Sequence, residues 1–406
     1  MEDNSATNFI QEVLPMSLYF VGIDISKYKH DCCILSAADQ KVVSKFTFKN
    51  DLQGFEQFLS ALSSLSSPED IRIGFESTAH YALNLELFLE NAHHSFMEIN
   101  PVLIKEYKKS TSLRRTKTDS VDCASIAHWL MTVEYKPHSK GFYHAYSLKS
   151  LTRLRDKLVR QRSFYLVKIT NVLDHTFPEF KPFFHEHLSK TALYLLETYG
   201  SAERMSRMDS ASYDKLRSLS RGKFSPRQFL RLKELAANTV GVNNSIFDTE
   251  LNSLLTLYKS LVKEICILEE EINRLIREVH PHYMSVPGIG TISAAVIYSE
   301  YGDISNFSSP AQMLAFAGIE PGINESGTES HKGRMVKHGS SQLRYVLINC
   351  CLPLIRSDMT FAAYYAKKRA EGKPHRVAIT HVAKKLVRVI YALERQGIDF
   401  NAQKLR

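Results

Sequence analysis

The sequence lacks the features of several large classes of protein. No apolar run approaches the ~20 residues that a membrane-spanning helix needs. The N-terminus is acidic and polar, without the basic and apolar segments of a secretory signal. The six cysteines form no CxxC pair, so their spacing fits neither a zinc knuckle nor a disulfide framework. These absences predict a cytoplasmic protein with reduced thiols and no membrane partner.

The composition is that of an ordinary globular protein with a basic excess. The 406 residues are 44% hydrophobic and 23% charged, which excludes wholesale disorder. At roughly 150 residues per domain, this length predicts two or three domains. Lys and Arg number 52 against 43 Asp and Glu, a net charge of +9. That excess favours a polyanionic partner such as nucleic acid.

The first ~135 residues follow the pattern of an α/β domain. Residues 18–25, 32–35 and 42–48 are predicted to be consecutive strands, and strands at 71–75 and 96–99 then alternate with helices at 54–65 and 81–89. Three consecutive strands followed by alternation are typical of an RNase H-like domain; a doubly wound fold would more often alternate from the start. We predict this domain over residues 16–140.

The rest of the chain has mostly helical patterns. Apolar residues recur at heptad spacing from Leu254 to Val279, as in a coiled coil or a long buried helix. With a second, basic helix over 148–173 this predicts a helical, coiled-coil domain at 141–282, in which residues 177–245 look irregularly helical. The third predicted domain, 283–400, begins with the sequence VPGIG. It continues with a polar loop at 318–341 and helices at 343–355, 360–369 and 377–395.

Four acidic residues stand where a metal site would need them. Asp24 and Glu76 each end a predicted strand, although an aspartate there also begins turns. Asp119 and Asp122 are three residues apart on a predicted helix, so they share one face; Asp119 would also complement the helix dipole. Four such carboxylates can hold a pair of hard cations, Mg²⁺ or Mn²⁺, about 4 Å apart for phosphoryl transfer.

Basic and glycine-containing segments surround these acids. The VPGIG segment, with Gly288 and Gly290, resembles a helix-hairpin-helix element, which approaches phosphate closely, although a tight turn between helices would look the same. Ser326 lies in the polar loop and by itself reads as an ordinary loop serine. The predicted nucleic-acid-binding residues are Lys105, Lys108, Lys109, Arg114, Arg115, Lys117, Gly288, Gly290, Lys332, Arg334 and Lys337.

Taken in order along the chain, these motifs resemble a known family. They are GIDISK, GFEST, RRTKTDSVDCASIA, LDHTFPEF, VPGIGTISAAVI, and ESG followed by KHGSSQLRYVL. The sequence is similar to the DEDD transposases of the IS110 insertion-sequence family, to which the Piv-type invertases are related. The resemblance covers residues from about 18 to 396.

The resemblance implies an RNase H-like domain of the RuvC type whose acids, at Asp24, Glu76, Asp119 and Asp122, bind Mg²⁺ (or Mn²⁺). It implies a coiled-coil domain, and a C-terminal domain whose serine nucleophile falls on Ser326, with Ser340 and Ser341 as rival positions. We prefer Ser326 because the later pair adjoins a helix start, where serine is a common cap. The implied partners are DNA (element ends and target) and a structured non-coding bridge RNA.

The expected activity is therefore that of a nucleoid-associated DNA recombinase, acting as a homo-oligomer, dimer or tetramer. A helix with heptads suits such assembly, and acids and serine could even come from different subunits. Two alternatives stay open. One is a RuvC-type metal-dependent endonuclease in which water attacks, and the other is a non-catalytic nucleic-acid-binding regulator.

Overall fold

A computed structural model describes residues 18–405 except 77–80, 112–118, 138–141, 186–187, 327–328, 336 and 338. For some residues within helices and strands, Asp119 and Ser326 among them, only the backbone is described. The chain divides into two compact units, Met1–Tyr143 and His144–Arg406. The first is mixed α/β and the second mostly helical, as the sequence predicts.

The first unit contains a five-stranded mixed sheet. Its strands are β1 (Tyr19–Ile25), β2 (Lys29–Ser36), β3 (Val42–Lys49), β4 (Ile71–Glu76) and β5 (Phe96–Ile99), in the spatial order β3-β2-β1-β4-β5. The first three strands pair antiparallel, whereas β4 is parallel to β1 and β5 is parallel to β4. This topology fits the RNase H-like arrangement and puts the C-terminal ends of β1 and β4 next to each other.

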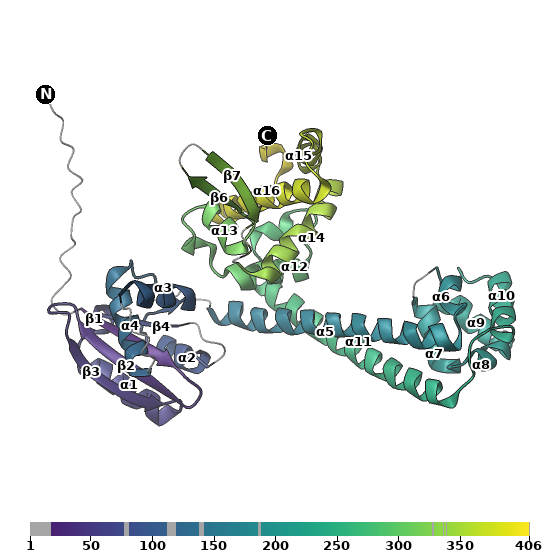
Figure 1. Cartoon of the computed structure of the whole chain (residues 1–406), viewed down its shortest axis with the longest axis horizontal. Coiled ribbons are helices and arrows are strands. Elements are labelled where there is room, and N and C mark those ends of the chain that lie inside the picture. Colours follow the sequence, from purple (N-terminus) through teal and green to yellow (C-terminus); the bar gives the residue numbers. More distant parts are fainter. Residues whose placement is uncertain are drawn as a thin grey trace. The chain divides into compact units, whose positions relative to one another are not determined.

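Helices cover both faces of this sheet (Figure 1). Helices α1 (Leu52–Ser63) and α2 (Leu83–Asn91) pack on the face that carries Val21 and Ile23. Helices α3 (Pro101–Thr111) and α4 (Asp119–Thr132) pack on the opposite face, with Phe20 and Leu35. Since neighbouring residues of a strand point to opposite faces, β1 contributes to both cores.

The second unit contains two long helices of 35 residues each, α5 (Phe142–Thr176) and α11 (Ser245–Val279). They run antiparallel, because Leu148 near the start of α5 clusters with Ile276 near the end of α11, and Ile169 of α5 clusters with Leu251. The segment between them, predicted only as irregularly helical, forms five short helices around a core of its own. They are α6 (Phe180–Phe183), α7 (Lys190–Tyr199), α8 (Ala202–Ser206), α9 (Ser210–Leu219) and α10 (Pro226–Ala237).

The C-terminal part is a helical bundle built on α12 (Thr291–Tyr301), α13 (Pro310–Ala317), α14 (Ser341–Ser357), α15 (Met359–Ala370) and α16 (His375–Gln396). Short 3₁₀ helices lie at η1 (Pro68–Asp70), η2 (His282–Ser285), η3 (Ile304–Asn306) and η4 (Ala402–Leu405). Among the described residues no single helix is long and apolar enough to span a membrane; α14 and α15 reach that composition only together, with a 108° bend between them.

One expectation for this region was wrong. The predicted loop at 318–341 contains an antiparallel hairpin of β6 (Pro321–Ser326) and β7 (Glu329–Met335), shown beside α13 in Figure 1. The segment has too few apolar residues to alternate visibly, so the pattern that normally marks a strand is missing. Backbone pairing between the two halves forms this hairpin, and that pairing leaves no trace in hydrophobicity.

Candidate active site

Asp24 and Glu76 end two neighbouring parallel strands on the same face of the sheet. The register pairs Ile23 of β1 with Phe75 of β4, the residues directly before the two acids. Adjacent strands lie about 4.8 Å apart, so the two carboxylates start from neighbouring positions. Both residues are half-buried. The prediction that these acids mark two strand ends is confirmed by the strand bounds.

Helix α4 lies directly over that face. A Cβ on Gly22 would come within 2.2 Å of the Cys123 carbonyl oxygen, and one on Gly74 within 2.8 Å of Leu130. These two glycines therefore let α4 approach the sheet more closely than any side chain would allow. Asp24 and Glu76 lie two residues further along their strands and so point to the same side as α4. Asp122 directly precedes Cys123 on α4, the helix that lies over this face.

Asp122 is already paired with a cation from the protein itself. The ammonium of Lys108, in the last turn of α3, lies 2.8 Å from Oδ1 of Asp122. The Asp122 side chain is 17% exposed and that of Lys108 is 30% exposed. The pair joins α3 to α4. Lys108 was predicted to contact nucleic acid, and in this structure it contacts an acid of the site.

A further carboxylate on this face was missed in the sequence. Asp31 of β2 is the register partner of Asp24 and so lies directly beside it. Its carboxylate accepts a 2.6 Å hydrogen bond from the Thr47 hydroxyl and lies 3.6 Å from the Lys29 ammonium. The signal was present, because Asp31 alternates with Cys33 and Leu35, but the predicted strand began at Cys32, three residues after β2 begins at Lys29.

The predicted acids come from neighbouring elements, the ends of β1 and β4 and the start of α4. Among the described side chains, however, no group of three His, Cys, Asp or Glu is close enough to hold a metal. Asp119 begins α4, but its side chain is outside what the structure describes. What supports a cation here is that the Lys108 ammonium stands in for one at Asp122. Oxygen ligands of this kind suit Mg²⁺ and Mn²⁺.

On the opposite face of the same sheet, a carboxyl group is buried without a cationic partner among the described residues. Glu86 of α2 is 1% exposed, and its Oε1 has no hydrogen-bond partner among the described residues. Burial, together with Glu98 of β5 close by, raises the pKa of Glu86 to about 9. Glu86 is therefore protonated and neutral at pH 7, so this carboxyl pair is a poor cation site.

The serine candidates occupy different settings in the second unit. By backbone register Ser326 is the last residue of β6 and pairs with Glu329, next to the turn of the hairpin. Ser340 caps α14, since its Oγ accepts from the Leu343 N–H at 3.2 Å, which confirms the predicted cap. Ser341 is the first residue of that helix.

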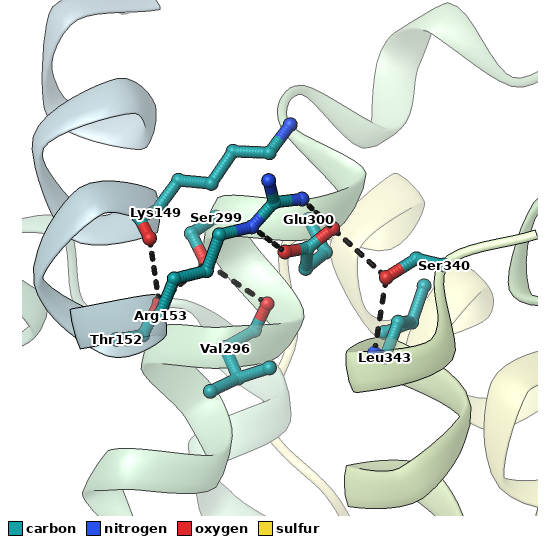
Figure 2. A network of polar contacts seen from close by, with 8 residues as sticks. All are labelled: Lys149, Thr152, Arg153, Val296, Ser299, Glu300, Ser340 and Leu343. Atoms are coloured by element: carbon teal, nitrogen blue, oxygen red, sulfur yellow. Dashed lines mark hydrogen bonds and ion pairs between the residues drawn. The ribbon is translucent and has the colours of Figure 1, made fainter. Parts of the chain in front are cut away.

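The hydroxyl of Ser340 has a second partner, Glu300 (Figure 2). It donates to Oε2 of Glu300 at 2.9 Å, while Arg153 of α5 donates from Nε to Oε1 at 3.0 Å and from a terminal nitrogen to Oε2 at 3.2 Å. The Glu300 side chain is 2% exposed. A buried carboxylate held by two partners ties α5, α12 and the start of α14 together, just after the hairpin.

The predicted nucleic-acid contacts are described only in part. Lys105, Lys109 and Lys337 are exposed. Gly288, at φ +93°, fits against α14, where a Cβ would lie 2.8 Å from the Leu354 nitrogen, so an internal contact accounts for this glycine. Gly290 is exposed at the N-terminus of α12 with nothing near its Cβ position. Arg114, Arg115 and Lys117 fall outside the described residues, as do the side chains of Lys332 and Arg334.

Two family models match the chain, one from the sheet through α5 and the other after α11. A DEDD transposase model of the IS110 type matches residues 21–178 and includes all four predicted acids. A model of the IS116/IS110/IS902 transposase family matches residues 281–366 and includes Ser326. Together the two matches cover more than half of the chain.

Individual relatives agree with these models. The chain is 27% identical to an uncharacterized 43.6 kDa protein of insertion element IS110 from Streptomyces coelicolor, over 71% of this chain and 73% of the relative. It is 24% identical to a 42 kDa protein of IS900 from Mycobacterium paratuberculosis, over 93% and 95%. It is 22% identical to a pilin gene-inverting protein from Moraxella bovis, over 95% and 98%.

Proposed function

Since the chain belongs to the IS110 family of insertion-sequence transposases, we propose that it cuts and rejoins DNA strands through a serine nucleophile, Ser326, with help from a divalent metal. The observation that carries the proposal is the placement of acids. Asp24 and Glu76 lie on neighbouring strands at the same sheet edge, and α4, the helix that carries Asp122, packs on the face to which both point. The DEDD family match spans this face.

Asp24, Glu76, Asp119 and Asp122 would hold the metal, Mg²⁺ or Mn²⁺. Bound there, it would stabilise the negative charge that builds up on the phosphoryl oxygens. The acids supply carboxylate oxygens from rigid elements, two strand ends and one helix start, so that little reorganisation is needed. Asp31 lies beside Asp24 but already accepts from Thr47, so its role is to hold the sheet margin rather than to bind the ion.

The covalent step conserves the phosphodiester. Ser326 Oγ loses its proton and bonds to phosphorus, while the bond from phosphorus to the leaving strand's oxygen breaks and that oxygen takes a proton. Attack by the free strand end reverses these changes and rejoins DNA without an external energy source. Ser326 is favoured over Ser340, because the Ser340 hydroxyl already donates to Glu300 and accepts from Leu343.

Two finer parts of the proposal rest on the family resemblance. One is a structured bridge RNA that would pair with donor and target DNA. Exposed Lys105 and Lys109 of α3 and Lys337 suit a nucleic-acid backbone of either kind. The other is a homo-oligomer, dimer or tetramer, in which acids and serine meet from different subunits. Apolar residues remain exposed on α5 and α11, among them Leu154, Phe164, Val167, Leu257 and Ile267, and they support such assembly.

A covalent-adduct assay tests the proposal. The protein is co-expressed with its native flanking DNA so that bound RNA is retained, then mixed with Mg²⁺ and labelled element-junction DNA. We expect a protein–DNA adduct on a denaturing gel for the wild type and for Ser340→Ala, and none for Ser326→Ala or Asp122→Asn. Free cleaved DNA that persists undiminished in Ser326→Ala would instead establish a metal-dependent nuclease. Binding without cleavage by any variant would establish a regulator.

A further inference from the structure

The pair between Lys108 and Asp122 has a consequence for how the site is loaded. Lys108 Nζ lies 2.8 Å from Asp122 Oδ1, within charge-assisted hydrogen-bond distance. The carboxylate is 17% exposed and the lysine 30%, so water screens the attraction only in part. The ammonium therefore contributes a positive charge at an oxygen that the proposed metal site needs.

Several carboxylates gather on the face of the sheet that α4 covers. Asp24, Asp31 and Glu76 all point to the side of the sheet that α4 covers. Like charges directly opposite each other in a sheet repel. A divalent cation would relieve this repulsion, and the Lys108 ammonium does the same for Asp122. A divalent ion and an ammonium at one carboxylate repel each other, so each weakens the binding of the other.

We infer that Lys108 is a displaceable counter-ion: it holds Asp122 in the metal-free protein, competes with the divalent metal, and on release turns to a nucleic-acid phosphate. This inference rests on the proposed function, because it takes Asp122 as a metal ligand. Lysine suits such a role, since its ammonium is a point charge on a flexible four-carbon stem. Exposed Lys105 and Lys109 lie on the same helix, so a phosphate approaching α3 would meet all three.

Metal affinity tests the competition. Full-length protein without DNA is titrated with Mg²⁺ alone by calorimetry, with the fluorescence of Trp129, the single tryptophan, as a second readout. Lys108→Met should bind Mg²⁺ about fivefold more tightly than the wild type, because the competing charge is gone. Lys108→Arg should bind it more weakly, since the guanidinium grips a carboxylate with two donors. Lys109→Met, the matched loss of an exposed neighbouring charge, should change the affinity less than twofold.

The outcomes separate this inference from the proposed function. Equal or weaker Mg²⁺ binding by Lys108→Met would overturn the counter-ion role, and so would an equal gain in Lys109→Met. In either case the metal site stands if Asp122→Asn loses Mg²⁺ binding. Binding by no variant, the wild type included, would overturn both. Thermal melting of each metal-free variant checks that it is folded. Lys108→Met and Lys108→Arg are predicted to shift the Mg²⁺ affinity in opposite directions, so if one of them misfolds, the other still tests the inference.

Release to phosphate has its own test. Affinity for a labelled DNA duplex is measured against salt concentration, with and without a fixed Mg²⁺ concentration. Each phosphate contact adds about 0.9 to the slope of log K against log salt. When Mg²⁺ is present, Lys108→Met should lower that slope by the equivalent of about one phosphate contact. In EDTA it should leave the slope unchanged. The same loss in both conditions, or no loss with Mg²⁺, would overturn the release.

Discussion

The two faces of the N-terminal sheet treat carboxyl groups in opposite ways. On the α1 and α2 face, Glu86 is buried without a cation, and its pKa is raised to about 9, so it is neutral. On the α3 and α4 face, Asp122 is paired with Lys108 and Asp31 lies near Lys29, so cations accompany these acids. The difference teaches that acids on one face indicate a metal site only where cations can accompany them, and not where a carboxyl group is buried without one.

The second unit adds a third case. Glu300 is as deeply buried as Glu86, yet Arg153 and Ser340 supply three hydrogen bonds to its two oxygens. A buried carboxylate with such partners serves structure, because its acceptor sites are already used and it has little left for an ion. Burial alone therefore does not assign a role; the partners do.

The largest difference between variants of the two faces is expected in the rate of DNA cleavage. Asp24→Asn should lower single-turnover cleavage of junction DNA about a thousandfold, since it removes an anionic metal ligand. Glu86→Gln, the matched acid-to-amide change on the other face, should leave the rate within about twofold. Comparable losses in both variants would mean that the faces do not differ in function.

The ion pair between exposed Arg153 and buried Glu300 should show the cost of leaving the Glu300 charge uncompensated. Arg153→Met leaves Glu300 buried without its ion-pair partner and should lower the free energy of unfolding by about 3 kcal/mol. Adding Glu300→Gln should recover most of that loss, because no buried charge then remains. Denaturant unfolding measures both, and Lys157→Met, an exposed cation on the same helix, is the control. A double variant no more stable than Arg153→Met would contradict this account.

Protonation of Glu86 predicts a pH dependence of stability. Its pKa is higher in the folded chain than in the unfolded chain, so the folded state binds an extra proton between about pH 5 and pH 9. Stability should fall as pH rises through this window, by at most about 1.4 kcal/mol per pH unit. Glu86→Gln should flatten this slope and add about 2 kcal/mol at pH 8. Melting temperatures across the window decide, and an unchanged slope would count against a neutral Glu86.

The smallest effect is expected at the helix cap. Ser340→Ala removes one cap bond and one hydrogen bond to Glu300, which should cost about 1 kcal/mol in unfolding free energy. Ser326→Ala should change stability by less than about 0.5 kcal/mol. The yield of covalent adduct should show the opposite pattern: Ser326→Ala should lose the adduct, and Ser340→Ala should keep it. Loss of the adduct in Ser340→Ala at a temperature where it is folded would transfer the nucleophile to Ser340.

Much of the fold was predictable because local patterns agree with it. The strands that carry Asp24 and Glu76 were predicted within about a residue of their bounds, and the two long helices were predicted but start six to nine residues earlier than expected. The β6–β7 hairpin was not, since it is too polar to alternate. Within the candidate site, the positions of Asp24 and Glu76 followed from strand ends. The closeness of Asp31 depends on strand register, and the contact from Lys108 depends on helix packing, which no local pattern shows.

Metal-directed cleavage of the protein chain tests the central claim that the ion binds at the α3 and α4 face. Fe²⁺ replaces Mg²⁺ in the full chain, and ascorbate with peroxide then generates hydroxyl radicals at the bound ion. Sequenced fragments should end near Asp24, near Glu76 and at the start of α4, and excess Mg²⁺ should suppress them. Cuts near Glu86 and Glu98 instead, or cuts unaffected by Mg²⁺, would contradict the account.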